Sequence, residues 1–302
     1  MKFKEINTGL SQEEILKNEV QDNLIHYLSN LWGHQERPER IVEDARKENI
    51  DLDLDTAVNK GLIGALKNKT PENLELILAF AKIYNISVDL SEPEIQQAVT
   101  HCYSILLSKT LPLEVSDLQK FINKHELVID KDYIFQQALV ITLSSGDGRK
   151  ANSLANKIKK DERDIDISDS EIKEALQQGL IKALVSGRAE EVNRLMTFSK
   201  KGNINVQTDE EAFVNATKEG LAQSFKDMRL GPGGVSFAEG MVKLVKKLKI
   251  PVDIKSPELI EICRELLTTT RASSELYPKE LRTFSAPPHI EYFLKQNGIK
   301  ID

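Results

Sequence analysis

The clearest candidates for acid–base chemistry are three closely spaced aspartates. Asp51, Asp53 and Asp55 alternate with leucines along the chain. Two neighbouring carboxylates can act as general acid and general base. These aspartates stand directly before a predicted helix, however, where such side chains accept hydrogen bonds from the free N–H groups of the first turn. We therefore interpret them as helix caps and predict no catalytic residue among them.

The thiols and imidazoles indicate no reaction centre either. His101 and Cys102 are adjacent, so a helix points their side chains in different directions. A nucleophile needs its base within hydrogen-bond reach. The sequence contains neither an HExxH nor a CxxC pattern, so we predict no metal site and no cofactor. Cys102 and Cys263 are interpreted as buried core thiols rather than as a disulfide.

Basic side chains gather in two segments, each predicted to be the second helix of a repeated unit. The default interpretation is a solvated helix face. If such helices line one surface, however, the clusters build a basic stripe in an acidic protein. An acidic protein segment, a phosphoprotein or an anionic lipid head group is then a plausible target. The clusters are Arg149, Lys150, Lys157, Lys159, Lys160 and Arg163, and the candidate partner-binding residues Lys243, Lys246 and Lys247 with Lys249.

A glycine-rich stretch covers residues 230–235. No Lys-Ser or Lys-Thr follows it and no strand precedes it, which argues against a phosphate-binding loop. We interpret it as an enlarged turn inserted between two helices. Because insertions in repeat proteins commonly map to the binding face, Gly231 and Pro232 are further candidate contacts for a partner.

A repeated helical unit must position all these side chains. A short β-branched motif recurs at intervals of 36 to 49 residues, and a period in this range is typical of stacked repeats. In several repeats the motif is preceded by Asn or Gly, which tolerate the left-handed conformation at a helix end. The motif begins at Ile50, Ile86, Leu127, Ile165, Ile204, Ile250 and Ile299.

Each motif is followed by polar or acidic residues that can cap a first helix. Ser91 with Glu94, and Ser168 with Glu171, have the spacing of a capping box. A polar turn and a second helix with a single apolar stripe come next.

The first helices carry small residues four positions apart, which places them on one helical face. Glycine inside a helix costs roughly 1 kcal/mol relative to alanine. Its recurrence at Gly61, Gly179 and Gly220 therefore indicates close approach by the next helix in the stack.

The sequence thus predicts an all-α fold, an α-solenoid of about seven helix–turn–helix repeats in a single elongated domain, residues 1–302. Trp32 is expected to cover the first repeat and the irregular segment 271–288 to cover the last. The alternatives are a partner hot spot at Trp32 and a docking arm at 271–288. The predicted repeats cover residues 6–49, 50–85, 86–126, 127–164, 165–203, 204–249 and 250–302.

Some of these residues resemble ankyrin repeats. Residues 180–196 are similar to that family's helix, glycine turn and second helix, and residues 202–206 and 291–298 to its repeat ending. The family's Thr-Pro-Leu-His start is absent, so the resemblance is to a divergent ankyrin-like repeat or a generic α-solenoid. It implies a concave surface that binds another protein, and it implies no catalytic residue.

Composition limits the partners. Charged residues make up 29% of the chain and hydrophobic residues 40%, as in ordinary globular proteins. The net charge of −6 argues against a general nucleic-acid binder. The sequence has no long apolar run and no signal peptide, which predicts a soluble, cytoplasmic protein without a membrane span. Secretion as an effector remains open.

Two functions follow from these patterns. The first is a non-catalytic scaffold that binds a protein or peptide through the solenoid surface, for example as a bacterial effector or accessory protein. The alternative is an enzyme or small-molecule binder with a site in the solenoid groove. A nucleic-acid solenoid would need a polar or aromatic residue at one fixed position of successive repeats, and the sequence shows none.

Overall fold

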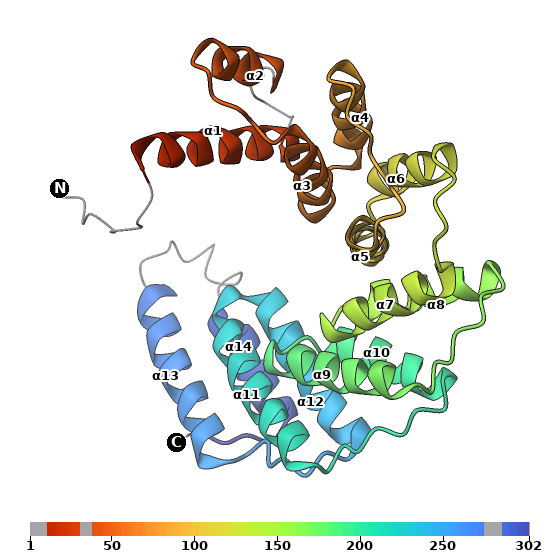
Figure 1. Ribbon diagram of the computed structural model, residues 1–302. Coiled ribbons are helices and arrows are strands. Elements are labelled where there is room, and N and C mark those ends of the chain that lie inside the picture. Colours follow the sequence, from red (N-terminus) through yellow and green to blue (C-terminus); the bar gives the residue numbers. More distant parts are fainter. Residues whose placement is uncertain (1–10, 31–37, 275–285, 302) are drawn as a thin grey trace. The chain divides into compact units, whose positions relative to one another are not determined.

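The computed structural model describes residues 11–30, 38–274 and 286–301. Within these ranges the chain forms only helices and no strand, which confirms that the fold is all-α (Figure 1). Trp32 and most of the segment 271–288 lie outside the described residues. The α-helices are α1 (Gln12–Ser29), α2 (Pro38–Lys47), α3 (Leu54–Asn68), α4 (Leu74–Ile83), α5 (Pro93–Lys109), α6 (Pro112–Lys124), α7 (Lys131–Ser144), α8 (Gly148–Lys160), α9 (Ser170–Val185), α10 (Ala189–Lys201), α11 (Glu211–Asp227), α12 (Pro232–Leu248), α13 (Pro257–Ser274) and α14 (Ala286–Gln296), with the short 3-10 helices η1 (Pro71–Asn73) and η2 (Met228–Leu230).

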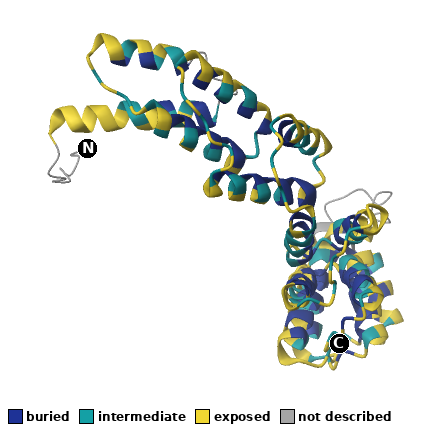
Figure 2. Ribbon diagram, turned by 45° about the vertical axis from the view of Figure 1, so that its right-hand side comes forward, coloured by how far each residue is buried: buried dark blue, intermediate teal, exposed yellow. Residues whose placement is uncertain are grey.

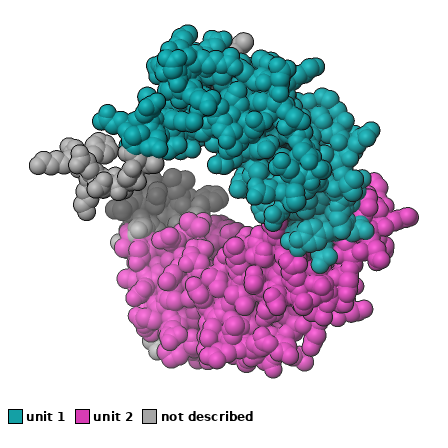
Figure 3. Space-filling model, viewed as in Figure 1, with its two compact units in different colours: residues 1–138 teal, residues 139–302 magenta. Residues whose placement is uncertain are grey.

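Two compact units make up the chain, unit 1 (Met1–Ala138) and unit 2 (Leu139–Asp302), with the boundary inside α7 (Figure 3). Each of the seven predicted intervals contains two α-helices, a first and a second. In unit 1 the first helices α1, α3 and α5 contact one another in order. In unit 2 the first helices α9, α11 and α13 do the same, and so do the second helices α8, α10, α12 and α14. That residues 1–302 form one elongated domain stays a prediction.

The second helices end alike. All seven end in a residue with a left-handed conformation, with φ between 49° and 63°. In six this is the last residue before the motif, and in α8 it is Glu162, three residues before Ile165. The next N–H then donates to the carbonyl oxygen five residues earlier, over 2.8–3.1 Å, which is the Schellman closure. The prediction for Asn and Gly is confirmed at four positions, and the structure adds Glu126, Glu162 and Lys249. The four confirmed residues are Asn49, Asn85, Asn203 and Gly298.

Helix starts follow the predicted chemistry only in part. Ser11 and the Glu14 carboxylate form a capping box at α1. The boxes predicted at Ser91 and Ser168 are wrong, because each serine hydroxyl donates over 2.6 Å to an aspartate two residues earlier. With these serines held in a local turn, α5 and α9 begin one residue later than a serine cap would place them.

Close packing of helix backbones explains the recurrent glycines. A Cβ atom on Gly179 would lie 1.8 Å from the carbonyl oxygen of Leu143, and one on Gly220 would lie 1.8 Å from that of Leu184. The helix that approaches is therefore the preceding first helix rather than the next one. Buried residues lie along the helix faces that meet within each unit, and exposed residues lie on the outer faces (Figure 2).

We expect Gly179→Ala and Gly220→Ala each to lower the free energy of unfolding by about 3 kcal/mol or more, because a methyl group would have to displace backbone atoms. Gly233→Ala is the matched control. It lies in the first turn of α12, and no other group lies within 4 Å of the place that its methyl group would take. We expect it to change stability by less than about 1 kcal/mol. Urea denaturation followed by circular dichroism measures all three. Equal effects at the three sites would contradict the close approach.

Candidate functional site

The three predicted lysines lie on the C-terminal half of α12 and are exposed. Lys243 pairs with a glutamate one turn earlier on its own helix. The Lys246 ammonium donates to the Asn297 Oδ1 atom at 3.4 Å, just beyond α14, and the Lys247 ammonium to the Asn193 Oδ1 atom on α10 at 2.8 Å. The side chains therefore spread across α12 from the side of α14 to the side of α10.

Gly231 and Pro232 lie at the opposite end of α12. Gly231 is the N-cap, with φ 81° and ψ −147°, a conformation open essentially to glycine. Pro232 follows at the first helical position, where a missing N–H costs little. The segment 230–235 is therefore a tight helix start rather than an enlarged turn. Pro232 and Lys246 are separated by about 21 Å of helix, so the two predicted sets do not form one site.

A third basic element lies between the two predicted clusters. α10 contacts α8 on one side and α12 on the other, and it ends in a pair of lysines. α8 also ends in a lysine pair, and α12 carries one just before its last residue. We call these three pairs the lysine edge. Its members are Lys159 with Lys160, Lys200 with Lys201, and Lys246 with Lys247.

The three helices run in the same direction, which places the lysine edge along one side of unit 2. The start of α8, at Gly148, lies against Arg194 and Glu191 in the first half of α10. Lys159 and Lys201, at the two helix ends, line one pocket. α12 follows the same direction, since Gly240 at its midpoint lies against Ala189 at the start of α10 and Lys247 reaches Asn193 further along it. The row is therefore staggered, because Lys247 lies beside the first half of α10.

The lysine edge forms no ion pair within the described part of unit 2. All six lysines are exposed, and among the described residues none is paired with a carboxylate. α8 carries five basic residues and no acidic one. By contrast α2, a second helix of unit 1, carries three of each sign. Unit 2 thus collects positive charge on one row of helices in a chain of net charge −6.

The helix dipole accounts for only part of this arrangement. A basic residue in the last turn lies near the partial negative charge of the helix end and is stabilised there. Single lysines of this kind occur in unit 1 at Lys67, Lys82 and Lys124. The dipole explains the position of one lysine per helix. It does not explain lysine pairs at the ends of three neighbouring helices.

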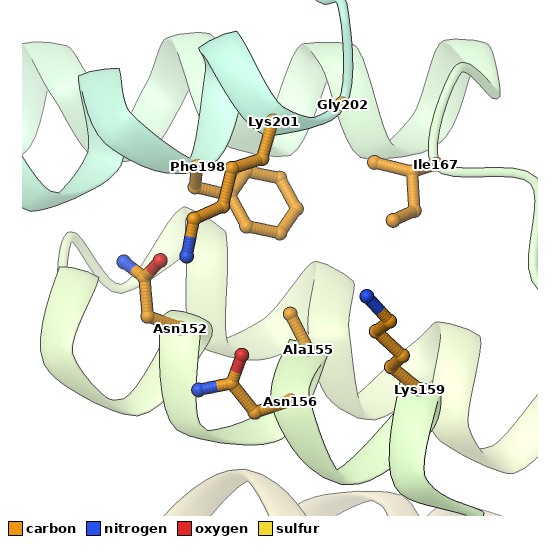
Figure 4. Close-up of a pocket in the computed structure, with 8 residues that line it drawn as sticks. All are labelled: Asn152, Ala155, Asn156, Lys159, Ile167, Phe198, Lys201 and Gly202. Carbon is orange, nitrogen blue, oxygen red and sulfur yellow. The ribbon is translucent and has the colours of Figure 1, made fainter.

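A pocket of about 430 Å³ opens between α8 and α10 (Figure 4). Its sides carry two ammonium groups and two carboxamides, and its inner surface is apolar. Figure 4 shows the Lys201 side chain running past Phe198 toward Asn152. None of the lining residues is acidic. They are Asn152, Ala155, Asn156, Lys159, Ile167, Phe198, Lys201 and Gly202, and we call this the α8–α10 pocket.

A second, smaller pocket of about 310 Å³ lies between α12 and α14. It contains the predicted Lys243 and Lys246, but also the Glu239 carboxylate that pairs with Lys243. Its wall includes Tyr292, a residue that is 59% exposed. Because this pocket carries charges of both signs, it is the weaker candidate for a charged ligand.

The candidate acid, base and thiol groups have structural roles. The Asp53 carboxylate caps α3, and hydrogen bonds from the Thr56 amide and hydroxyl lower its pKa. Cys102 and Cys263 are buried, unpaired thiols, and burial raises the pKa of each to about 12. The capping of Asp53 and the core position of both thiols are thus confirmed. The described residues contain no cluster of ligands that would hold a metal ion.

One charged cluster was not predicted from the sequence. The Glu75 carboxylate on α4 accepts hydrogen bonds from Lys124 at 2.6 Å and from His125 at 3.0 Å, at the end of α6. Burial raises the pKa of Glu75, but these two hydrogen bonds outweigh it, so the pKa lies below its usual value. Lys124 and His125 are 49 and 50 residues from Glu75 along the chain, and no local pattern signals their meeting. The cluster joins two second helices of unit 1.

No protein-family model matches the chain, and no curated protein matches its sequence. Among the helices in the described part of the chain, none has both the length and the apolar character needed to cross a membrane.

The Glu75 cluster predicts a pH-dependent loss of stability. A carboxylate whose pKa is lowered by folding stabilises the protein above its unfolded-state pKa, and this contribution disappears as the pH falls through the folded-state value. We expect Glu75→Gln to lower the free energy of unfolding by up to about 1 kcal/mol at pH 7, since the pair is partly exposed. The difference should shrink as the pH falls below about 4.3, the ordinary pKa of glutamate, and vanish in stronger acid, where Glu75 is protonated in the folded state as well.

Urea denaturation at pH 7 and in stronger acid checks this expectation. Glu72→Gln is the control, because Glu72 is exposed and lies one turn away on η1. A deficit of Glu75→Gln that persists unchanged in acid would show that lost packing, not lost charge, is responsible.

Proposed function

We propose that this protein is a non-catalytic interaction scaffold, an ankyrin-like α-solenoid of about seven helix–turn–helix repeats that binds an acidic protein segment along the lysine edge. The observation that carries the proposal is the row of three lysine pairs for which the described residues supply no carboxylate partner. The paired helices in each predicted repeat interval, and the identical closure of the second helices, support the repeat interpretation.

Electrostatics favours an acidic partner for this surface. Six exposed ammonium groups on adjacent helix ends create a positive potential that steers anions toward unit 2. Complementary charge raises the association rate and suppresses wrong partners more than it adds affinity. At physiological ionic strength the potential decays over about 8 Å, so the partner must lie directly against the helix ends.

A small-molecule binder is the second candidate function, and the α8–α10 pocket favours it. Its volume falls within the range of about 300–1,000 Å³ that ligand pockets occupy. Nothing in its lining is a nucleophile or a carboxylate base, so its chemistry suits binding rather than turnover. A pocket that receives one side chain of a bound protein segment reconciles the two functions.

A charge-reversal experiment tests the proposed function. The probe is a fluorescein-labelled peptide of twelve residues rich in glutamate, and fluorescence anisotropy measures its affinity for the full chain. We expect binding that weakens with added salt, and a loss of at least tenfold in the variant Lys200→Glu, Lys246→Glu, Lys247→Glu. The control reverses the same number of exposed lysines in unit 1, Lys67→Glu, Lys82→Glu and Lys109→Glu, and should weaken binding less than threefold.

Equal losses in the two triple variants would show that net charge alone governs binding, and would contradict a site on the lysine edge. Tighter binding of a single-stranded RNA of equal charge would likewise exclude the acidic-segment function, as would the absence of peptide binding at low salt.

A further inference from the structure

Two of the residues that line the α8–α10 pocket, Ala155 and Gly202, are small. Gly202 ends α10 with φ −89°, which any residue can adopt, so its small size rather than its backbone freedom matters here. A Cβ atom on Gly202 would lie 2.7 Å from the Cγ2 atom of Ile167, in the connection between α8 and α9. Ala155 is the small lining residue on α8. Phe198, only 2% exposed, closes the pocket from behind.

The polar side of the pocket is held in place by Asn152. Its Nδ2 atom donates to the Gly148 carbonyl oxygen at 2.8 Å on its own helix and to the Arg194 carbonyl oxygen at 3.0 Å on α10. These bonds link the two helices and occupy both N–H groups of the amide. The ligand donors that remain are therefore the Lys159 and Lys201 ammonium groups and the Asn156 amide.

The charge of the pocket indicates its ligand. Two ammonium groups face a lining with no carboxylate, and among the described residues neither group has an acidic partner. A phosphoryl group carries a charge of about −1.5 to −2 at pH 7 and three acceptor oxygens, whereas a carboxylate carries one charge and two oxygens. Two lysines and one amide match the charge and the three acceptor oxygens of a phosphoryl group. The ends of α8 and α10 present partial negative charge to the same place, so anion binding must depend on these lysines.

We propose that the α8–α10 pocket receives a phosphorylated side chain of the acidic segment that binds the lysine edge. The phosphoryl group lies between Lys159 and Lys201, and the carbon stem contacts Phe198 and Ile167. This inference rests on the proposed function and deepens it, because it assigns one position of the partner a chemical identity.

The lysine pairs provide a matched control for this proposal. Lys159 and Lys201 line the pocket, whereas their chain neighbours Lys160 and Lys200 are equally charged and exposed but do not. The double variants Lys159→Ala, Lys201→Ala and Lys160→Ala, Lys200→Ala therefore remove the same charge from the same two helices. Ala155→Leu fills the pocket and changes no charge.

Two probes are compared by fluorescence anisotropy on the full chain, the glutamate-rich peptide described above and the same peptide with phosphoserine at one central position. We expect the phosphopeptide to bind at least tenfold more tightly. The advantage should disappear in Lys159→Ala, Lys201→Ala and fall at least fivefold in Ala155→Leu, while Lys160→Ala, Lys200→Ala retains it. Circular dichroism confirms that each variant is folded.

Three results would overturn the pocket assignment while leaving the lysine edge as an acidic-segment site. They are equal binding of the two peptides, equal loss of the phosphopeptide advantage in the two double variants, and displacement of the phosphopeptide by inorganic phosphate at the concentration of the peptide's own Kd. The last would show that the pocket holds a free anion. Failure of both peptides to bind would instead remove the proposed function itself.

Discussion

The left-handed closure at the end of each second helix is the constraint on which the rest of the structure depends. The last carbonyl groups of a helix have no partner within it, and the closure satisfies one of them with the N–H of the residue after the left-handed position. Seven closures have nearly the same φ and the same hydrogen bond, so the chain leaves each second helix in the same way. In unit 2 neighbouring second helices then run in parallel, and this alone brings lysines from different helices to one edge.

Contact between the first helices depends on a second constraint, the absence of side chains at a few positions. Gly179 and Gly220 let helix backbones approach to distances that a methyl group forbids. Gly202, at the end of α10, likewise permits a close contact. Ile167 packs beside α10 at the place where a side chain on Gly202 would begin. Here the approach does not fill the space completely, and Ala155 and Gly202 both line the pocket that remains. The α8–α10 pocket is a by-product of the packing that holds the row together.

Sequence reasoning identified what local chemistry determines. Helix pairs, the left-handed ends at Asn49 and Asn203, and the cap at Asp53 each depend on residues close in the chain. It failed where one side chain had two possible local hydrogen bonds. The Ser168 hydroxyl donates to Asp166 instead of capping α9. Sequence reasoning also missed Lys249 in a left-handed conformation, since only the whole closure offsets that strain. The basic clusters were visible in the sequence, but their connection through α10 required the contacts between helices. No pattern along the chain indicates a pocket.

The arrangement of charges on the lysine edge does not maximise the stability of unit 2. Opposite charges exchanged between neighbouring helices would stabilise unit 2 slightly, as the pairing of Glu75 with Lys124 does between α4 and α6 in unit 1. Asp161 and Glu162 directly follow Lys160, but among the described residues no carboxylate pairs with any lysine of the lysine edge. The lysines therefore remain available to an outside anion, and their mutual repulsion is relieved when one binds. This excess of positive charge within an acidic chain is the physical reason to expect a function at this edge and not at the balanced second helices of unit 1.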